Sequence, residues 1–179
     1  MVTGWTTVGS SVQHSAFLGA KSNITLVGSG IRLTGATLID DIALLIDSWP
    51  RIDSLGGIAA TGSYEFDAAL DLATVATRRF EADIAATSFD DGFKLDAIET
   101  LMDDWGPLDG DAVNDCDVTL YASVTNDNPA GSPAWGAWTP FFVADFSCRA
   151  ARFKLEFASG NPQHNIEVTT LRVDVNEPA

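Results

Sequence analysis

Apolar and polar residues alternate along the last third of the chain, from about residue 117 to residue 175. Side chains of a β-strand point to opposite faces in turn, so alternation predicts strands that bury one face and present the other to solvent. The pattern is sharpest in the segment 152–157, where every second residue is large and apolar. The predicted inward set is Val118, Leu120, Ala122, Val124, Phe153, Leu155 and Phe157, and the outward set is Arg152, Lys154 and Glu156.

The last predicted strand contains a change of phase. Ile166 and Val168 share one face. The next apolar residues fall one position out of step with them: Leu171, Val173 and Val175. An extra residue in one strand of an antiparallel pair, a β-bulge, would return these residues to the same side of the sheet. We therefore expect a bulge between the two sets.

Two more alternating segments lie in the middle of the chain and predict a further pair of strands. Consecutive strands with one apolar face are typical of an antiparallel sheet that is solvated on one side. Short strands, turn-rich connections and little helical periodicity indicate an all-β fold, a jelly-roll-like antiparallel β-sandwich. The inward residues are Tyr64, Phe66, Ala68, Leu70 and Leu72 in the first segment and Phe80, Ala82, Ile84 and Ala86 in the second.

Residues 1–48 differ from the rest of the chain because glycine, serine and threonine separate short apolar pieces. The pieces are 24–27, 31–33 and 42–46, and glycines between them favour tight turns. Two interpretations are open: an arm with its own hairpin, or the first edge strands of the sandwich. We assign residues 1–48 to this arm or edge, which we expect to contact another subunit, and residues 49–179 to the sandwich domain.

The segment 90–117 forms an acidic insertion with ten carboxylate residues and a single base, Lys94. Leu95, Ile98, Leu101, Met102 and Trp105 follow a helical spacing and predict one short amphipathic helix. The loop from Asp103 to Asp117 has the clustered carboxylates that Ca²⁺ prefers, but it lacks the spacing of a known ligand loop. A solvated acidic loop without a cofactor is the interpretation we favour.

The net charge excludes two classes of partner. Ten basic residues stand against 25 acidic ones, which gives −15 at neutral pH. Such a surface repels phosphate backbones and anionic lipid head groups, so we expect neither nucleic-acid binding nor membrane insertion. The two cysteines, Cys116 and Cys148, match no zinc pattern. We expect them to be free thiols, although each borders a predicted strand and a disulfide between them is geometrically open.

The sequence offers little for catalysis. The carboxylate pairs Asp90/Asp91 and Asp103/Asp104 could be proposed as a glycosidase acid and nucleophile. That chemistry needs two carboxyl groups held roughly 5–10 Å apart across a cleft, whereas adjacent residues point away from each other. The chain contains neither a Gly-x-Ser-x-Gly elbow nor a phosphate loop, and we expect both histidines to lie on the surface: His14 and His164.

A candidate ligand site lies in the loop that follows the strand 117–124. The loop is rich in Asn, Asp and Pro, and two tryptophans follow it across a Gly-Ala turn. Aromatic faces beside amide and carboxylate groups are common in sugar sites, but tryptophan at the start of a strand also packs across sandwiches. Both interpretations stay open. The candidate ligand-binding residues are Asp127, Asn128, Trp135 and Trp138.

From about Trp49 to Asn176 the chain resembles the C-terminal region of tail-tip host-specificity proteins of siphophages and gene transfer agents. The order of the matching pieces is kept across some two-thirds of the chain. The same pattern is similar to discoidin-like, galactose-binding-type β-sandwiches. The segments that carry the resemblance are 48–54, 62–66 with 70–72, 102–111, 124–135, 138–145 and 149–157.

This resemblance implies a non-enzymatic structural protein of the virion, located at the tail tip or in a tail fibre and assembled in the host cytoplasm. It implies contacts with other tail-tip and hub proteins, a homotrimer, and a contribution to recognition of a host surface glycan or receptor. No catalytic residues come with the resemblance. The alternatives are a carbohydrate-binding module that acts as the receptor binder and a small glycan hydrolase.

Overall fold

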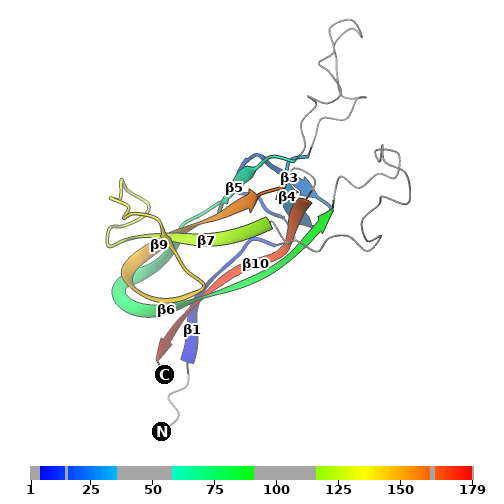
Figure 1. The fold of residues 1–179 in the computed structure, drawn as a ribbon. Helices are drawn as coiled ribbons and strands as arrows, with labels where there is room; N and C mark the ends of the chain where they lie inside the picture. Colours follow the sequence, from blue (N-terminus) through cyan, green and yellow to red (C-terminus); the bar gives the residue numbers. More distant parts are fainter. Residues whose placement is uncertain (1–4, 15, 36–57, 91–115, 162–163, 179) are drawn as a thin grey trace, which may run out of the picture.

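A computed structural model describes residues 5–14, 16–35, 58–90, 116–161 and 164–178 (Figure 1). Within these ranges all regular secondary structure is β, and every strand pairs antiparallel with its neighbours, so the predicted all-β sandwich is confirmed. The strands are β1 (Trp5–Val12), β2 (Ala20–Ser22), β3 (Ile24–Val27), β4 (Gly30–Leu33), β5 (Thr61–Glu65), β6 (Leu70–Asp90), β7 (Cys116–Thr125), β8 (Thr139–Pro140), β9 (Val143–Ser159) and β10 (His164–Pro178).

The strands form two layers. In one layer β9 pairs with β7 along one edge and with β5 along the other, and β2 continues the sheet beyond β5. In the other layer β10 pairs with β6 on one edge and with β1 and β4 on the other. The long strands β6 and β9 pair with each other and curve together at one side of the molecule (Figure 1). This pairing joins the layers into a nearly closed, barrel-like sandwich.

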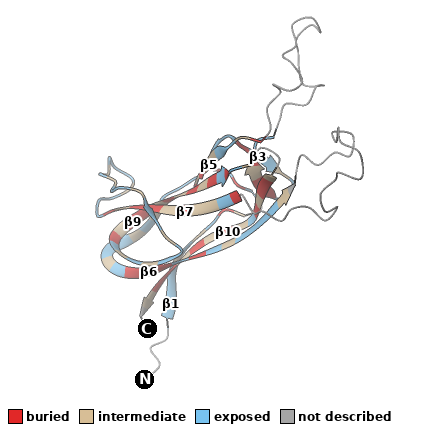
Figure 2. Cartoon of the chain, in the orientation of Figure 1, coloured by how far each residue is buried: buried red, intermediate tan, exposed pale blue. Residues whose placement is uncertain are grey.

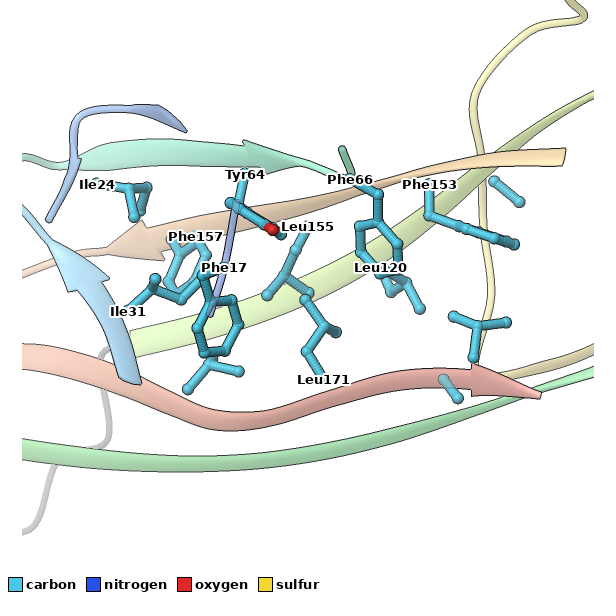
Figure 3. Close-up of a cluster of buried hydrophobic side chains, with 14 of the residues drawn as sticks. Phe17, Ile24, Ile31, Tyr64, Phe66, Leu120, Phe153, Leu155, Phe157 and Leu171 are labelled. Atoms are coloured by element: carbon cyan, nitrogen blue, oxygen red, sulfur yellow. The ribbon is translucent and has the colours of Figure 1, made fainter. Parts of the chain in front are cut away.

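The core lies between the two layers (Figures 2 and 3). Phe153, Leu155 and Phe157 of β9 are no more than 1% exposed, as their alternation predicted. Leu120 and Ala122 of β7 are also buried. Val118 and Val124 are half-buried and pack against the same cluster. Removing this apolar area from water is the main term that stabilises the fold.

The predicted bulge in β10 is confirmed. The register between β10 and β6 shifts between Val168 and Thr170. Apolar residues on both sides of the shift consequently enter the core: Ile166, Val168, Leu171, Val173 and Val175 are all at most 5% exposed.

The segment 64–72, predicted as one strand, is divided in two. β5 ends at Glu65, the chain bends, and β6 begins at Leu70, so that Ala68 is exposed rather than inward. β5 and the start of β6 pair one after the other along the same edge of β9. The chain steps from one pairing to the next at the bend. Ala86, predicted inward, is likewise exposed in the distal half of β6.

The described part of the N-terminal segment belongs to the sandwich sheet. β1 and β4 pair with β10, β3 pairs with β4, and β2 pairs with β5, so these strands extend both layers. Phe17, Ile31 and Leu33 are no more than 1% exposed and join the core cluster. The apolar piece 42–46 lies outside the described residues.

A buried hydrogen-bond network fastens this N-terminal segment to β5. The Tyr64 hydroxyl donates to Gln13 Oε1 at 2.6 Å and accepts from the Gly19 backbone N–H at 3.0 Å. A Cβ atom on Gly19 would lie 1.9 Å from the Glu65 carbonyl oxygen, so only glycine allows this approach. Figure 3 shows Tyr64 between the layers beside Phe17, and the two rings meet edge to face with centroids 5.6 Å apart.

Several predictions fall outside the described residues. They include the helix spaced from Leu95 to Trp105 and nearly all of the acidic loop that ends at Asp117. Cys116 and Cys148 are both buried and are free thiols in the structure. No helix long and apolar enough to cross a bilayer occurs among the residues that the structure describes.

Candidate functional site

The loop between β7 and β8 is held in shape by two of the predicted ligand residues. Asp127 Oδ2 accepts a hydrogen bond from the Ala134 backbone N–H at 2.8 Å. Asn128 Oδ1 accepts from the Ala130 backbone N–H at 3.0 Å. Asp and Asn side chains commonly stabilise turns in this way. Both side chains therefore serve the loop itself, and their substitution would alter its conformation.

The same loop is mounted firmly on β7. The Gly136 backbone N–H donates to the Val124 carbonyl at 2.9 Å, and Ser123 Oγ donates to the Gly136 carbonyl at 2.7 Å. Thr125 Oγ1 accepts from the Asp127 backbone N–H at 3.1 Å. Because these bonds connect both ends of the loop to one strand, they hold the loop in a fixed position on the sheet.

Trp135 and Trp138 lie on the outer side of the sheet and not across the sandwich core. Their ring centroids are 4.9 and 4.7 Å from Cζ of Arg152, an outward residue of β9. Lys154 Nζ is 5.0 Å from the Trp138 centroid and 5.4 Å from that of Tyr121 on β7. We call these five residues the aromatic–cationic ladder. Each such contact contributes about 0.5–2 kcal/mol, depending on how far the cation is desolvated.

The ladder explains why the outward cations of β9 are only partly exposed. Arg152 is half-buried, and its Nε atom has no hydrogen-bond partner within the described structure, so the indole rings supply its main favourable contacts. Lys154 Nζ pairs with Glu156 Oε1 at 2.6 Å, and the Lys154 side chain is 22% exposed. The prediction that these residues face outward is correct, but the tryptophans cover them.

A shallow hollow of about 340 Å³ lies beneath the loop. Asp127 and Trp135 line it together with Asn126 and Ser147. Asn128 and Trp138 are not part of its wall. Of the four predicted ligand residues, the structure therefore brings two to one surface depression. The other two support the loop and the ladder.

A larger groove of about 440 Å³ lies on the outer face of the layer formed by β2, β5, β9 and β7. Cross-strand pairing places four outward polar residues in one row across this face: Ser22, Ser63, Glu156 and Thr119. Tyr121, a member of the ladder, lines the same groove. Sequence reasoning missed this site. The polar positions alternate visibly along each strand, but which of them become neighbours depends on the pairing of strands distant in sequence.

Burial and hydrogen bonding shift the pKa values of two titratable groups. Burial raises the pKa of the Tyr64 hydroxyl above its ordinary value, partly opposed by the hydrogen bond from Gly19. Hydrogen bonding to Arg79 lowers the pKa of the exposed Asp145 carboxyl. His14 and His164, predicted as surface residues, are both half-buried. The described residues include no cluster of three His, Cys, Asp or Glu that could hold a metal ion.

The candidate acid–nucleophile pairs cannot be placed. Asp91, Asp103 and Asp104 lie outside the described residues, as does the side chain of Asp90.

Comparison with known proteins adds no assignment. No protein-family model matches the chain, and searches of curated proteins and of solved structures return no match.

Proposed function

We propose that the chain is a non-enzymatic structural component of a phage tail tip or tail fibre. The supporting observation is that segments carrying the resemblance to tail-tip host-specificity proteins form one packed unit. Trp135 and Trp138 come from two of these segments and stack on Arg152 from a third. Inside the sandwich, Phe66 from the first described segment packs on Phe153, with ring centroids 5.2 Å apart. A rigid sandwich that supports a braced loop suits a structural and recognition role.

The assembly surface that we propose is β1. Trp5, Val8 and Val12 are 48%, 42% and 51% exposed, and the strand carries no charged residue (Figure 2). Neutral edge strands with exposed apolar residues readily add another strand or subunit. A homotrimer would cover three copies of this strand. Light scattering after size exclusion should then give three times the 19.0 kDa of one chain, and a Trp5→Asp, Val8→Asp variant should give the monomer mass.

The tail assignment is tested on purified particles. Mass spectrometry of gradient-purified phage or gene-transfer-agent particles from the source cells should detect the chain. Immunogold labelling should place it at the distal end of the tail. If the chain is absent from every particle fraction while present in the lysate, the virion role is refuted.

We further propose that the loop at 126–138 contributes to host recognition. The observation that favours it is the hollow that Asp127 and Trp135 line together. A carbohydrate-binding module acting as the receptor binder is the alternative function that this hollow supports. Several weak sites on one tail would act together through avidity.

The loop test must avoid the residues that maintain its shape. Asn126 and Ser132 are exposed, and neither side chain takes part in the hydrogen bonds that close the loop. Particles carrying Asn126→Ala and Ser132→Ala should assemble normally and adsorb more slowly to host cells. Asp127→Ala is the comparison variant. It removes a hydrogen bond that closes the loop, so it should also lower the thermal stability of the domain, whereas the Asn126/Ser132 variant should not. Normal adsorption by the Asn126/Ser132 variant would refute a receptor contact at this loop.

A further inference from the structure

The groove on the β2–β5–β9–β7 face has the chemistry of a ligand site distinct from the loop. Its central row runs across four strands, from Ser22 through Ser63 and Glu156 to Thr119. Neighbouring strands are about 4.8 Å apart, so the row spans roughly 14 Å, the length of a short oligosaccharide. The sheet fixes this row, because each backbone position is held by ladder hydrogen bonds.

The groups along the row suit a ligand with many hydroxyls. Serine and threonine hydroxyls both donate and accept hydrogen bonds, whereas carboxylates accept from pairs of adjacent donors. Glu156 retains capacity beyond its pair with Lys154, since its side chain is 42% exposed. Asp117 is exposed two residues before Thr119 on β7 and also lines the groove. A sugar chain presents adjacent hydroxyls that match this arrangement.

Charge decides which sugars fit. Two carboxylates line the groove and the chain carries a net charge of −15, so phosphorylated or acidic glycans would be repelled. Lys154, which pairs with Glu156 of the groove, is also engaged by Tyr121 and Trp138. The Tyr121 ring supplies an aromatic wall where the groove meets the ladder. Aromatic rings with a polar tip are well suited to surfaces that are partly apolar and partly wet.

We infer that this groove binds a neutral oligosaccharide, with Glu156 and the row of hydroxyls as hydrogen-bonding partners and Tyr121 as the aromatic contact. The inference goes beyond the proposed tail function, because sugar binding by the isolated chain does not depend on where the chain is assembled. It also differs from recognition at the loop, since the two depressions share no lining residue among those that the structure describes.

The test uses the intact chain on a printed array of neutral and acidic bacterial surface oligosaccharides. Calorimetric titration with the best neutral binder follows. We expect Glu156→Gln and Tyr121→Ala each to raise the Kd by about tenfold or more, which corresponds to about 1.4 kcal/mol. Phe142→Ala and Asp83→Asn are matched controls, because both residues are exposed and lie outside the groove. Both controls should bind as the unmodified chain does.

Three results would overturn the inference. They are failure to retain any neutral oligosaccharide, retention of acidic ones alone, or binding weakened by Asn126→Ala but not by the groove variants. Thermal melts check that each variant is folded. Should Tyr121→Ala unfold, Glu156→Gln decides the question, because it preserves side-chain size on a partly exposed position. None of these outcomes changes the result expected from purified particles, so the two proposals fail separately.

Discussion

Replacing Tyr64 by phenylalanine tests whether the N-terminal segment is an integral part of the sandwich. The substitution removes one oxygen atom and keeps the ring, which is fully buried. It deprives Gln13 Oε1 of its donor and the Gly19 N–H of its acceptor, and both bonds are buried. The variant retains the edge-to-face contact between Phe17 and the ring at position 64, so it tests the two hydrogen bonds by themselves.

The expected loss can be worked from these two bonds. A buried polar group left without a partner costs about 1–3 kcal/mol, so the pair should cost at least about 2 kcal/mol. For a chain of this length, each kcal/mol lowers the Tm by roughly 2–4 °C, which predicts a fall of about 4–8 °C. Gln13 Nε2 also donates to Asp67 Oδ1 at 3.0 Å, which limits how far Gln13 can turn to find a new partner.

Urea unfolding followed by tryptophan fluorescence measures this loss, with Tyr121→Phe as the matched control. Tyr121 is half-exposed on the outer face, so removing its hydroxyl should change stability by no more than about 0.5 kcal/mol. If both variants are as stable as the unmodified chain, the buried connection between the N-terminal segment and β5 is refuted.

Three further perturbations test other parts of the fold. Leu155→Ala should cost about 2–5 kcal/mol in urea unfolding because the side chain is fully buried; a loss below 1 kcal/mol would contradict the core assignment. Gly19→Ala should destabilise the domain more than Gly131→Ala, whose added Cβ would meet nothing closer than 3.5 Å; equal melting temperatures would contradict the close approach. Burial raises the pKa of the Cys148 thiol above 9.0, so its neutral form is favoured in the folded state. The neutral thiol therefore contributes fully to the free energy of unfolding below about pH 9, and this contribution is lost as the pH rises through the folded pKa. Cys148→Ala should flatten the decline in unfolding free energy at alkaline pH.

Local pattern was sufficient for β9 and β10. The alternation of Phe153, Leu155 and Phe157 and the change of phase after Val168 predicted which face each strand buries, because a strand's period is a property of its own sequence. The inward assignment failed at Ala68, where the chain steps from one pairing with β9 to the next. That step follows from the sheet as a whole and leaves no local signal.

The candidate site was predicted less well, because it depends on contacts between distant segments. Trp135 and Trp138 were candidate ligand residues in the sequence, but whether they cover a core or an outer face depends on their contact with Arg152. Asp127 looks like a ligand residue in the sequence, whereas its carboxylate closes the loop. The row that includes Ser63 and Glu156 exists only once β5 pairs with β9.

The position of β10 has a consequence for the order in which the molecule folds. It is the last strand of the described chain, yet β1, β4 and β6 all pair with it, and Trp5 lies opposite Pro178. β1 therefore cannot pair until a segment some 170 positions away in the sequence has reached it, and the second layer forms only after that pairing. Folds dominated by such remote pairings reach the native state in milliseconds to seconds, far more slowly than helical proteins. Throughout that interval β1 and β6 expose unpaired edges, and a neighbouring chain could capture them before β10 does.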